Sequence, residues 1–132
     1  MSRWSDKVCQ RCGGGKGKKY RDLKYCGTCT YAVRKERSRN AHARALEKRY
    51  GITRADYDAL YAAQGGVCYI CRRATGKTRR LSVDHDHATG KVRGLLCRPC
   101  NNILGHARDD IEFFERAIEF LKNPPANAIL VS

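Results

Sequence analysis

The densest polar cluster in the sequence is Asp84-His85-Asp86-His87. Cleavage of a phosphodiester bond needs an activated water, a cation near the scissile phosphate and a means of protonating the leaving oxygen. A histidine side chain titrates near neutral pH and can act as the base, and Mg²⁺ prefers hard oxygen ligands such as carboxylates and amides. Asp84 and the side-chain oxygen of Asn101 are the best candidates for metal ligands, and His85 is the candidate base.

Eight cysteines, all in CxxC pairs, frame this cluster and the N-terminal part of the chain. In a CxxC pair, one tight turn directs two thiolates at a single ion. Taken two by two, the pairs form Cx2C-x13-Cx2C and Cx2C-x25-Cx2C, which predicts two structural zinc sites whose four positions are all filled by sulfur. The predicted ligands are Cys9, Cys12, Cys26 and Cys29 in the first site and Cys68, Cys71, Cys97 and Cys100 in the second.

Disulfides and redox chemistry are the competing interpretations of these cysteines. The N-terminus has no apolar stretch typical of a secretory signal, which disfavours four disulfides. A redox CxxC pair would need a βαβ context that is missing from the sequence. Zinc also answers a stability problem, because a module as small and glycine-rich as residues 5–30 buries little apolar surface, and a structural zinc contributes on the order of 10 kcal/mol.

Two strands and a helix are needed to position the polar cluster. Residues 81–83 alternate like a strand, residues 88–91 are turn formers, and residues 92–96 are expected to form the returning strand. Pro99 suits the first turn of a helix, which would carry Asn101 directly behind a zinc ligand. The expected local order is therefore strand, loop, strand and helix, held at both ends by one zinc ion.

The first of these strands cannot be regular throughout. Neighbouring side chains on a regular strand point to opposite faces of the sheet. Asp84 and His85 can therefore act on one substrate only if the strand ends or bulges at His85. The run of polar and turn residues up to Gly90 is compatible with that irregularity, and Asp86 is expected to be a loop residue rather than a ligand.

Three further helices are expected outside this unit. Residues 30–50 lack glycine and proline and should form a solvated basic helix, and residues 53–64 should form a second helix. In the C-terminal helix, Asp109 is the expected N-cap and Glu112 completes a capping box before Asn123 ends the helix. Its apolar stripe, which should pack on its own domain or across a dimer, consists of Ile111, Phe114, Ile118 and Leu121.

The charge balance points to a polyanionic partner. Lys and Arg outnumber Asp and Glu by 27 to 13, and 16 of these basic residues but only 6 of the acidic ones lie in residues 1–60. Such an excess favours nucleic acid over an anionic membrane, although a merely solvated basic surface is the simpler alternative. The candidate phosphate contacts are Lys16, Lys18 and Lys19 in a glycine-rich loop, with Arg93 and Arg98 near the polar cluster.

The segment VDHDHATGKVRGLLCRPCNNILG, with CYIC upstream, resembles the recombination endonuclease VII family of phage resolvases, within the His-Me finger (HNH-like) nucleases. The resemblance implies a ββα-metal core in which Asp84 and Asn101 bind catalytic Mg²⁺ or Mn²⁺ and His85 is the general base. His87 is similar to the family's additional active-site histidine, which contacts phosphate or substrate. Some members have an acidic residue three positions after the asparagine, where this chain has Leu104, so a third metal ligand stays open.

These observations together predict a small, zinc-stabilised α+β protein with a ββα-metal core, flanking helices and an N-terminal zinc ribbon or knuckle. The expected division is a DNA-contacting ribbon over 1–31, a basic linker helix over 32–52 and a nuclease domain over 53–132. The resemblance implies a metal-dependent endodeoxyribonuclease that acts on branched DNA such as Holliday junctions. It also implies a homodimer, since resolving a junction needs two nicks. The expected location is the cytoplasm, that of the host if a phage encodes the chain, with no membrane partner.

Two other functions remain open at this point. An HNH-type endonuclease could nick duplex DNA without a preference for branches. A non-catalytic DNA-binding protein with two zinc sites would suit the N-terminal module, but it leaves Asp84, His85 and Asn101 unexplained.

Overall fold

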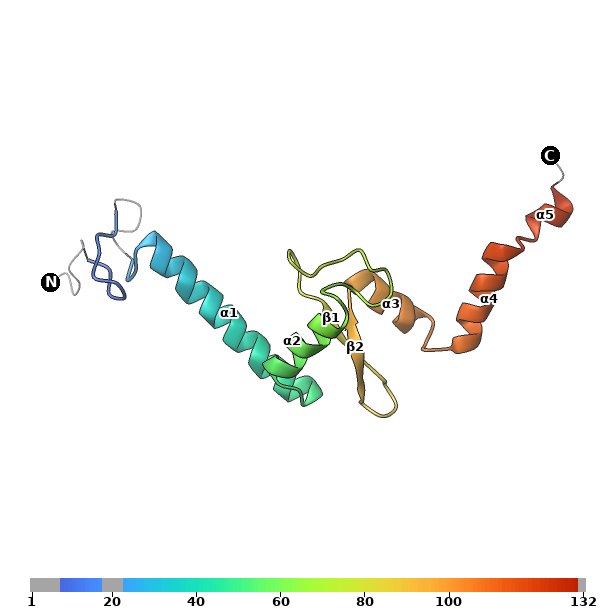
Figure 1. Ribbon diagram of the computed structural model, residues 1–132, viewed down its shortest axis with the longest axis horizontal. Coiled ribbons are helices and arrows are strands. Elements are labelled where there is room, and N and C mark those ends of the chain that lie inside the picture. Colours follow the sequence, from blue (N-terminus) through green and yellow to red (C-terminus); the bar gives the residue numbers. More distant parts are fainter. Residues whose placement is uncertain (1–7, 18–22, 131–132) are drawn as a thin grey trace. The chain divides into compact units, whose positions relative to one another are not determined.

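The computed structural model describes residues 8–17 and 23–130, and its chain divides into two compact units. The first unit is Met1–Arg54 and the second is Ala55–Ser132. Figure 1 shows that the first contains one long helix, whereas the second contains the strands and the remaining helices. Among the described residues, every helix is too short or too polar to cross a lipid bilayer.

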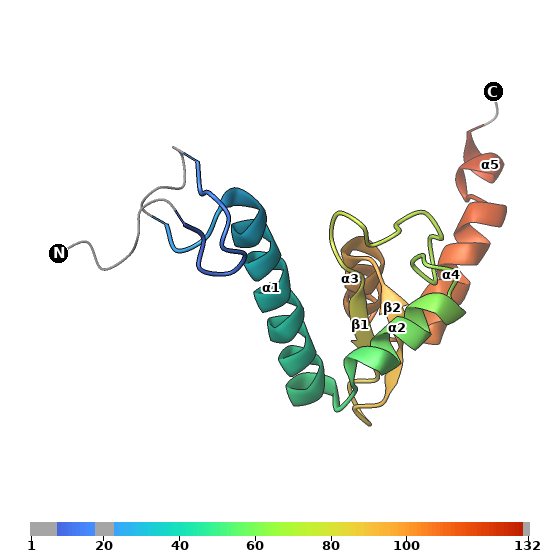
Figure 2. The same ribbon diagram turned by 60° about the vertical axis from the view of Figure 1, so that its left-hand side comes forward.

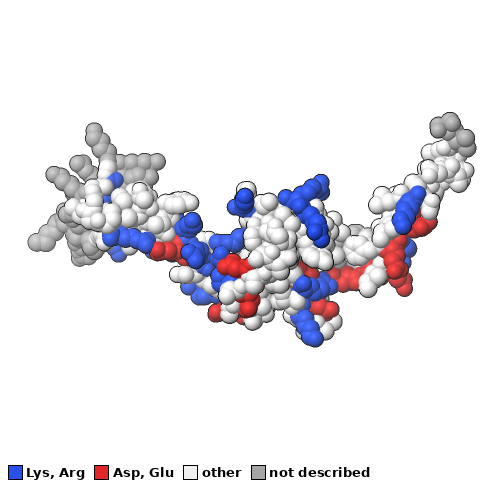
Figure 3. Space-filling model, viewed as in Figure 1, with Lys and Arg blue, Asp and Glu red and all other residues white. Residues whose placement is uncertain are grey.

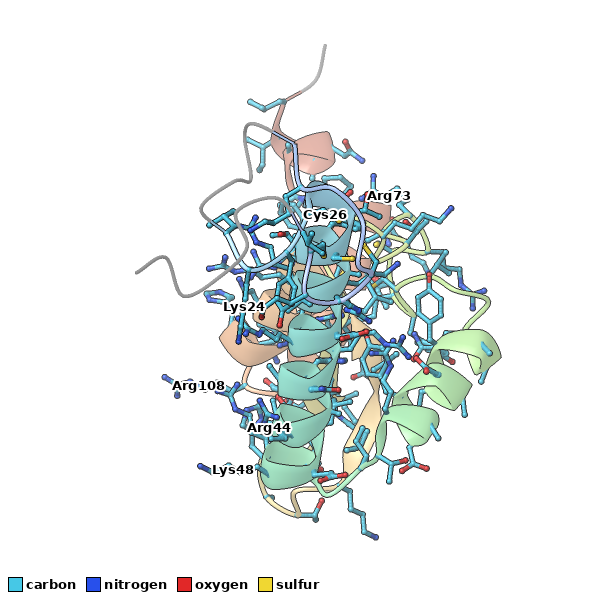
Figure 4. All side chains as sticks on the ribbon, turned by 90° about the vertical axis from the view of Figure 1, so that its left-hand side faces the viewer. Lys24, Cys26, Arg44, Lys48, Arg73 and Arg108 are labelled. Atoms are coloured by element: carbon cyan, nitrogen blue, oxygen red, sulfur yellow. The ribbon has the colours of Figure 1, made fainter. Side chains whose placement is uncertain are left out.

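The first unit is dominated by α1 (Gly27–Tyr50), a helix whose interior lacks glycine and proline. It begins three residues earlier than expected, because the Cys26 side chain caps it by accepting a hydrogen bond from the Cys29 N–H. It ends at Gly51, whose positive φ of 65° lets its N–H donate to the Glu47 carbonyl oxygen at 3.0 Å. Arg44 and Lys48, one turn apart, project from the same side of α1 (Figure 4).

A tight turn precedes α1 in the first unit. The Cys9 N–H donates to the Gly14 carbonyl oxygen at 2.8 Å and the Gly13 N–H donates to the Cys9 carbonyl oxygen at 2.9 Å. An ion pair between Arg11 and Glu36 joins this turn to α1 and lowers the pKa of Glu36. The turn and the helix are thereby connected both through the cysteines and across the surface.

The second unit is built around a two-stranded antiparallel sheet, β1 (Ser82–His85) and β2 (Val92–Leu96). Val83 pairs with Leu95, and these residues are buried together with Leu81 and Leu96. The second strand has the bounds expected from the sequence, whereas β1 begins one residue later than expected and continues through Asp84 to His85. Figures 1 and 2 both place α3 (Arg98–His106) beside the sheet, so strand, strand and helix follow one another as expected.

The helix α2 (Arg54–Ala63) and the residue that follows it hold the sheet in place. The buried Tyr57 hydroxyl donates to the Leu81 carbonyl oxygen at 2.8 Å, just before β1. Gln64 makes a double hydrogen bond to Leu95 of β2, donating to its carbonyl oxygen at 2.8 Å and accepting from its N–H at 2.7 Å. Gly94 keeps this approach open, because a Cβ there would lie 3.0 Å from Gln64 Oε1.

The C-terminal part consists of α4 (Ile111–Lys122) and α5 (Ala126–Ile129), of which α5 is not predicted by the sequence pattern. The structure describes every residue of α4, and none of them is buried. The N-cap of α4 is Asp110, whose carboxylate accepts from the Glu112 N–H at 2.9 Å, so the prediction that Asp109 caps this helix is wrong. The protein is thus a small α+β fold with a two-stranded sheet and two cysteine clusters.

Candidate functional site

The cysteines of the second cluster come together as their spacing predicts. Their four sulfur atoms lie within 4.8 Å of one another, and the Sγ atoms of Cys71 and Cys97 are 3.8 Å apart. Sulfurs placed at about 2.3 Å from one ion, at the corners of a tetrahedron, would be separated by about 3.8 Å. The cluster Cys68, Cys71, Cys97 and Cys100 therefore fits a zinc ion.

Hydrogen bonding and burial shift the pKa values of the cysteines in this cluster in opposite directions. Backbone N–H groups of Ala74 and Arg73 lower the pKa of Cys71 to about 6, which favours its thiolate at neutral pH. Burial, and after it the neighbouring sulfurs, raises the pKa of Cys100 to about 12. Four thiolates at this separation repel one another, and a divalent cation among them removes that repulsion.

The first cluster has the same chemistry. Its sulfurs also lie within 4.8 Å of one another, and the Sγ atoms of Cys12 and Cys26 are 3.9 Å apart. Burial alone would raise the pKa of Cys9, but N–H groups led by that of Cys26 lower it to about 6. Burial raises the pKa of Cys29 to about 12. The cluster Cys9, Cys12, Cys26 and Cys29 therefore fits a second zinc ion.

The second cluster also fixes the start of α3. Cys97 is the N-cap of this helix and Cys100 lies in its first turn. Asn101 follows at once, and its N–H donates to the Cys97 carbonyl oxygen at 2.9 Å. The backbone of Asn101 is therefore held directly by a cysteine of the second cluster.

The register of the sheet shifts next to His85, but the irregularity is in the second strand. Asp84 pairs with Gly94 and His85 pairs with Val92, so Arg93 is the extra residue of a β-bulge in β2, while β1 ends at His85. The Arg93 guanidinium forms a double hydrogen bond with the Asp84 carboxylate, with Nε to Oδ2 at 2.7 Å and Nη2 to Oδ1 at 3.1 Å. Asp84 is only 6% exposed, so this pairing compensates a buried negative charge.

The sequence patterns miss one residue of this site, Asp109. Its Oδ1 accepts a second hydrogen bond from Arg93 Nη2 at 2.9 Å, and its Oδ2 lies 3.2 Å from His87 Nδ1. These contacts, led by that of Arg93, lower the pKa of Asp109. Asp84, Arg93, Asp109 and His87 therefore form one connected polar network.

The backbone explains why Asp109 faces this network. Arg108 and Asp109 both have left-handed conformations, with φ of 53° and 57°. Such a conformation costs a non-glycine residue about 1–2 kcal/mol, and aspartate is among the residues that adopt it most readily. Two aspartates stand in succession before α4, and the structure uses Asp110 as the cap and Asp109 in the site.

The two histidines of the predicted cluster lie next to each other. The ring centroids of His85 and His87 are 4.8 Å apart, with the ring planes inclined by 42°. Asp86, between them, accepts hydrogen bonds at 2.8 Å from the N–H groups of Ala88 and Thr89, as expected of a loop residue. These bonds lower the pKa of Asp86.

The residues predicted to contact phosphate differ in their exposure and in their partners. Lys16 is only 5% exposed and its Nζ donates to the Leu23 carbonyl oxygen at 2.9 Å, a position that does not suit a phosphate contact. Lys18 and Lys19 lie outside the described residues. Arg93 is engaged by two carboxylates, whereas Arg98 is exposed at the start of α3.

Comparison with known proteins identifies a matching family and related phage proteins. A family model described as "Recombination endonuclease VII" matches residues 43–123, which include the second cluster and the polar network. Proteins named "Gene 59 protein" from Mycobacterium phages L5 and D29 are 54% and 51% identical to the chain over 115 residues, which cover 83% of this chain and 70% of each relative. No solved structure matches the chain.

Proposed function

The chain belongs to the recombination endonuclease VII family, and on this premise we propose that it is a magnesium-dependent DNA endonuclease that cleaves branched DNA such as four-way junctions. The observation that carries the proposal is the position of Asp84 and His85 at a bulged hairpin whose two ends meet in one four-cysteine cluster. The proposal treats β1, β2 and α3 as the ββα-metal core of a His-Me finger nuclease.

In the proposed reaction, His85 is the general base. It accepts a proton from a water molecule that attacks the phosphorus in line, while the bond to the 3′-oxygen breaks and a 5′-phosphate is formed. His87 contacts the phosphate or the substrate beside it. The carboxylate of Asp109 beside Nδ1 supports this role, because it can accept a hydrogen bond from an Nδ1–H group and so favours that orientation of the His87 ring.

The donor chemistry at Asp84 fits a hard divalent cation. Its buried carboxylate already binds a cationic group, the Arg93 guanidinium. We propose that Asp84 and the amide oxygen of Asn101 hold Mg²⁺ or Mn²⁺, which when bound would stabilise negative charge on the phosphate and on the leaving oxygen. Arg93 would then keep Asp109 as its partner, since its Nη2 donates to both carboxylates.

A homodimer is part of the proposal, because two strands of a junction must be cut together. The exposed apolar face of α4 supports it: Ile111, Ile118 and Leu121 are 73%, 52% and 77% exposed. An apolar stripe of this kind is expected to pack against another element. In light scattering, Leu121→Asp should give the mass of a monomer where the wild type gives a dimer. The control Glu115→Gln should leave the dimer intact, and a dimeric Leu121→Asp variant would exclude this face as the interface.

A cleavage assay with two substrates tests the proposed function. A four-way junction and a linear duplex of the same sequence are incubated with the full chain, with and without Mg²⁺. Preferential cleavage of the junction in Mg²⁺ is the expected result, whereas equal cleavage would identify a nuclease of duplex DNA. DNA binding without cleavage in Mg²⁺ or Mn²⁺ would identify a non-catalytic double-zinc protein, which the pairing of both Asp84 oxygens with Arg93 would suit.

A further inference from the structure

A basic cavity lies beside the second cysteine cluster, and the residues assigned to the reaction are not part of its lining. It has a volume of about 380 Å³ and is lined by residues 73–80 and by the start of α3, from Cys97 to Pro99. Of its eleven lining residues five are Lys or Arg and none is acidic, so the cavity attracts anions. These five are Arg73, Lys77, Arg79, Arg80 and Arg98. Figure 3 shows basic side chains gathered over this part of the second unit, whereas acidic side chains gather over α4.

The cysteine cluster alone does not account for so many cations. A zinc ion with four thiolate ligands carries two net negative charges, which would balance two of the five basic side chains. Within the described part of the chain, Arg73, Lys77, Arg79 and Arg98 have no carboxylate partner. The excess of positive charge therefore faces the cavity and the solvent.

The loop that carries these cations is held in a defined conformation. The Tyr61 hydroxyl donates to the Thr75 carbonyl oxygen at 2.6 Å, and Tyr57 holds Leu81 at the other end of the loop. Gly76 has a φ of 70° and lies so close to Leu81 that a Cβ would be 3.1 Å from Leu81 Cγ. Less ordering of this loop is then needed when an anion binds, which favours binding.

The start of α3 adds to the attraction for anions. The helix has nine residues, no side chain caps its N-terminus, and its first turn has no acidic residue. The positive end of its dipole, carried by the first residues of the helix, therefore lies at the cavity wall. Arg98 in this wall and Asn101 are three residues apart and are neighbours on one face of α3.

We propose that this cavity binds the phosphodiester backbone of a DNA strand next to the cleavage site, through contacts that do not depend on base sequence. The inference rests on the proposed function for the identity of its ligand. The loop leads directly into β1, which carries Asp84 and His85, and the other wall belongs to the helix that carries Asn101. A strand held here is thereby positioned relative to all three residues.

The salt dependence of DNA binding tests this inference. The variant Lys77→Gln/Arg79→Gln removes two loop cations and leaves every cysteine unchanged. Arg116→Gln/Lys122→Gln is the control, because it removes the same charge from α4. Binding of the full chain to a four-way junction is measured without divalent metal over a range of salt concentrations. The plot of log affinity against log salt should become shallower by about 1–2 for the loop variant, and it should not change for the control.

Two further measurements distinguish failure of this inference from failure of the proposed function. In single-turnover cleavage, the loop variant should need a higher protein concentration than the wild type to reach its maximal rate, whereas the control should follow the wild type. A loop variant that binds the junction like the control would overturn the inference and leave the nuclease proposal standing. Stabilisation of the wild type, but not of the loop variant, by inorganic phosphate, together with a salt slope of the loop variant equal to that of the control, would indicate a small-anion site and overturn strand binding.

Discussion

The two cysteine clusters are alike where they begin a helix and different in what lies between their halves. In each, the second CxxC pair supplies the N-cap and a first-turn residue of a helix, Cys26 and Cys29 for α1 and Cys97 and Cys100 for α3. Each contains one cysteine whose pKa is lowered to about 6 and one whose pKa is raised to about 12. The same arrangement of ligands therefore serves both units.

The inserts make the difference between the two clusters. The first insert is rich in glycine and lysine and has no histidine, whereas the second contains the hairpin with Asp84, His85 and His87. The first cluster also precedes the segment matched by the endonuclease family, and the second lies within it. The cysteine spacing therefore predicts a metal site in both clusters, and under the proposed function only the second insert adds residues that act in cleavage.

The largest effect on folding and cleavage is expected when one cysteine ligand is replaced, in either cluster. A structural zinc contributes on the order of 10 kcal/mol to folding, so Cys100→Ser should unfold the hairpin unit and abolish cleavage. Cys29→Ser should disrupt only the first unit, and it should leave cleavage intact when the DNA is saturated with protein. Zinc content measured by mass spectrometry should fall from two ions to one in both variants. Loss of cleavage in Cys29→Ser at saturating protein would show that the two clusters are not independent.

Arg93→Gln tests the polar network of Asp84, Arg93, Asp109 and His87, which belongs to the second unit. Without Arg93 the buried Asp84 carboxylate lacks its partner, which should lower the free energy of unfolding by about 1–3 kcal/mol in the absence of divalent metal. Mg²⁺ should raise the melting temperature of this variant more than that of the wild type, because the guanidinium no longer competes for Asp84.

The exposed pair of Arg116 and Asp110 provides the control for Arg93. Arg116→Gln should change the free energy of unfolding by less than about 0.5 kcal/mol, and Mg²⁺ should stabilise it only as much as the wild type. An equal effect of Mg²⁺ on Arg93→Gln and the wild type would argue against a cation at Asp84.

Glycine substitutions beside each cluster should give the smallest difference in stability between the two units. Gly13 and Gly76 both have φ near +70°, but a Cβ at Gly13 meets no atom within 4 Å. Gly13→Ala should therefore cost about 1 kcal/mol of conformational strain alone. Gly76→Ala should cost more, about 2 kcal/mol, because its Cβ would also press on Leu81. Thermal unfolding of the zinc-loaded protein measures both, and equal losses would contradict the packing seen at Gly76.

Much of the second unit could be predicted from local sequence patterns. The CxxC spacing brings the cysteines together because it reflects the geometry of a tight turn. The first strand is indicated by the alternation of residues 81–83, and the second by the run 92–96 that follows the turn formers. An end or a bulge of the first strand at His85 is predicted because Asp84 and His85 could not otherwise share a substrate; β1 does end at His85, but the bulge lies opposite, at Arg93 of β2. These features depend on residues close together in the sequence.

The remaining features depend on contacts that no local pattern reveals. Asp109 satisfies the rule for a helix cap, yet a left-handed backbone turns it toward Arg93 and His87, which lie 16 and 22 residues away. Lys16 stands in a glycine-rich loop but is buried with its Nζ on the Leu23 carbonyl oxygen. The start of α1 was misplaced because a cysteine side chain, rather than a serine or an aspartate, caps it.

The most direct test of the central claim is the cleavage rate of His85→Ala on a four-way junction in Mg²⁺, measured beside His106→Ala. His106 is exposed in the last turn of α3, so its replacement should leave the rate unchanged. Loss of a general base should reduce the rate by a factor of about 10²–10⁴, while zinc content and affinity for the junction stay at their wild-type values. Wild-type cleavage by His85→Ala would contradict the account.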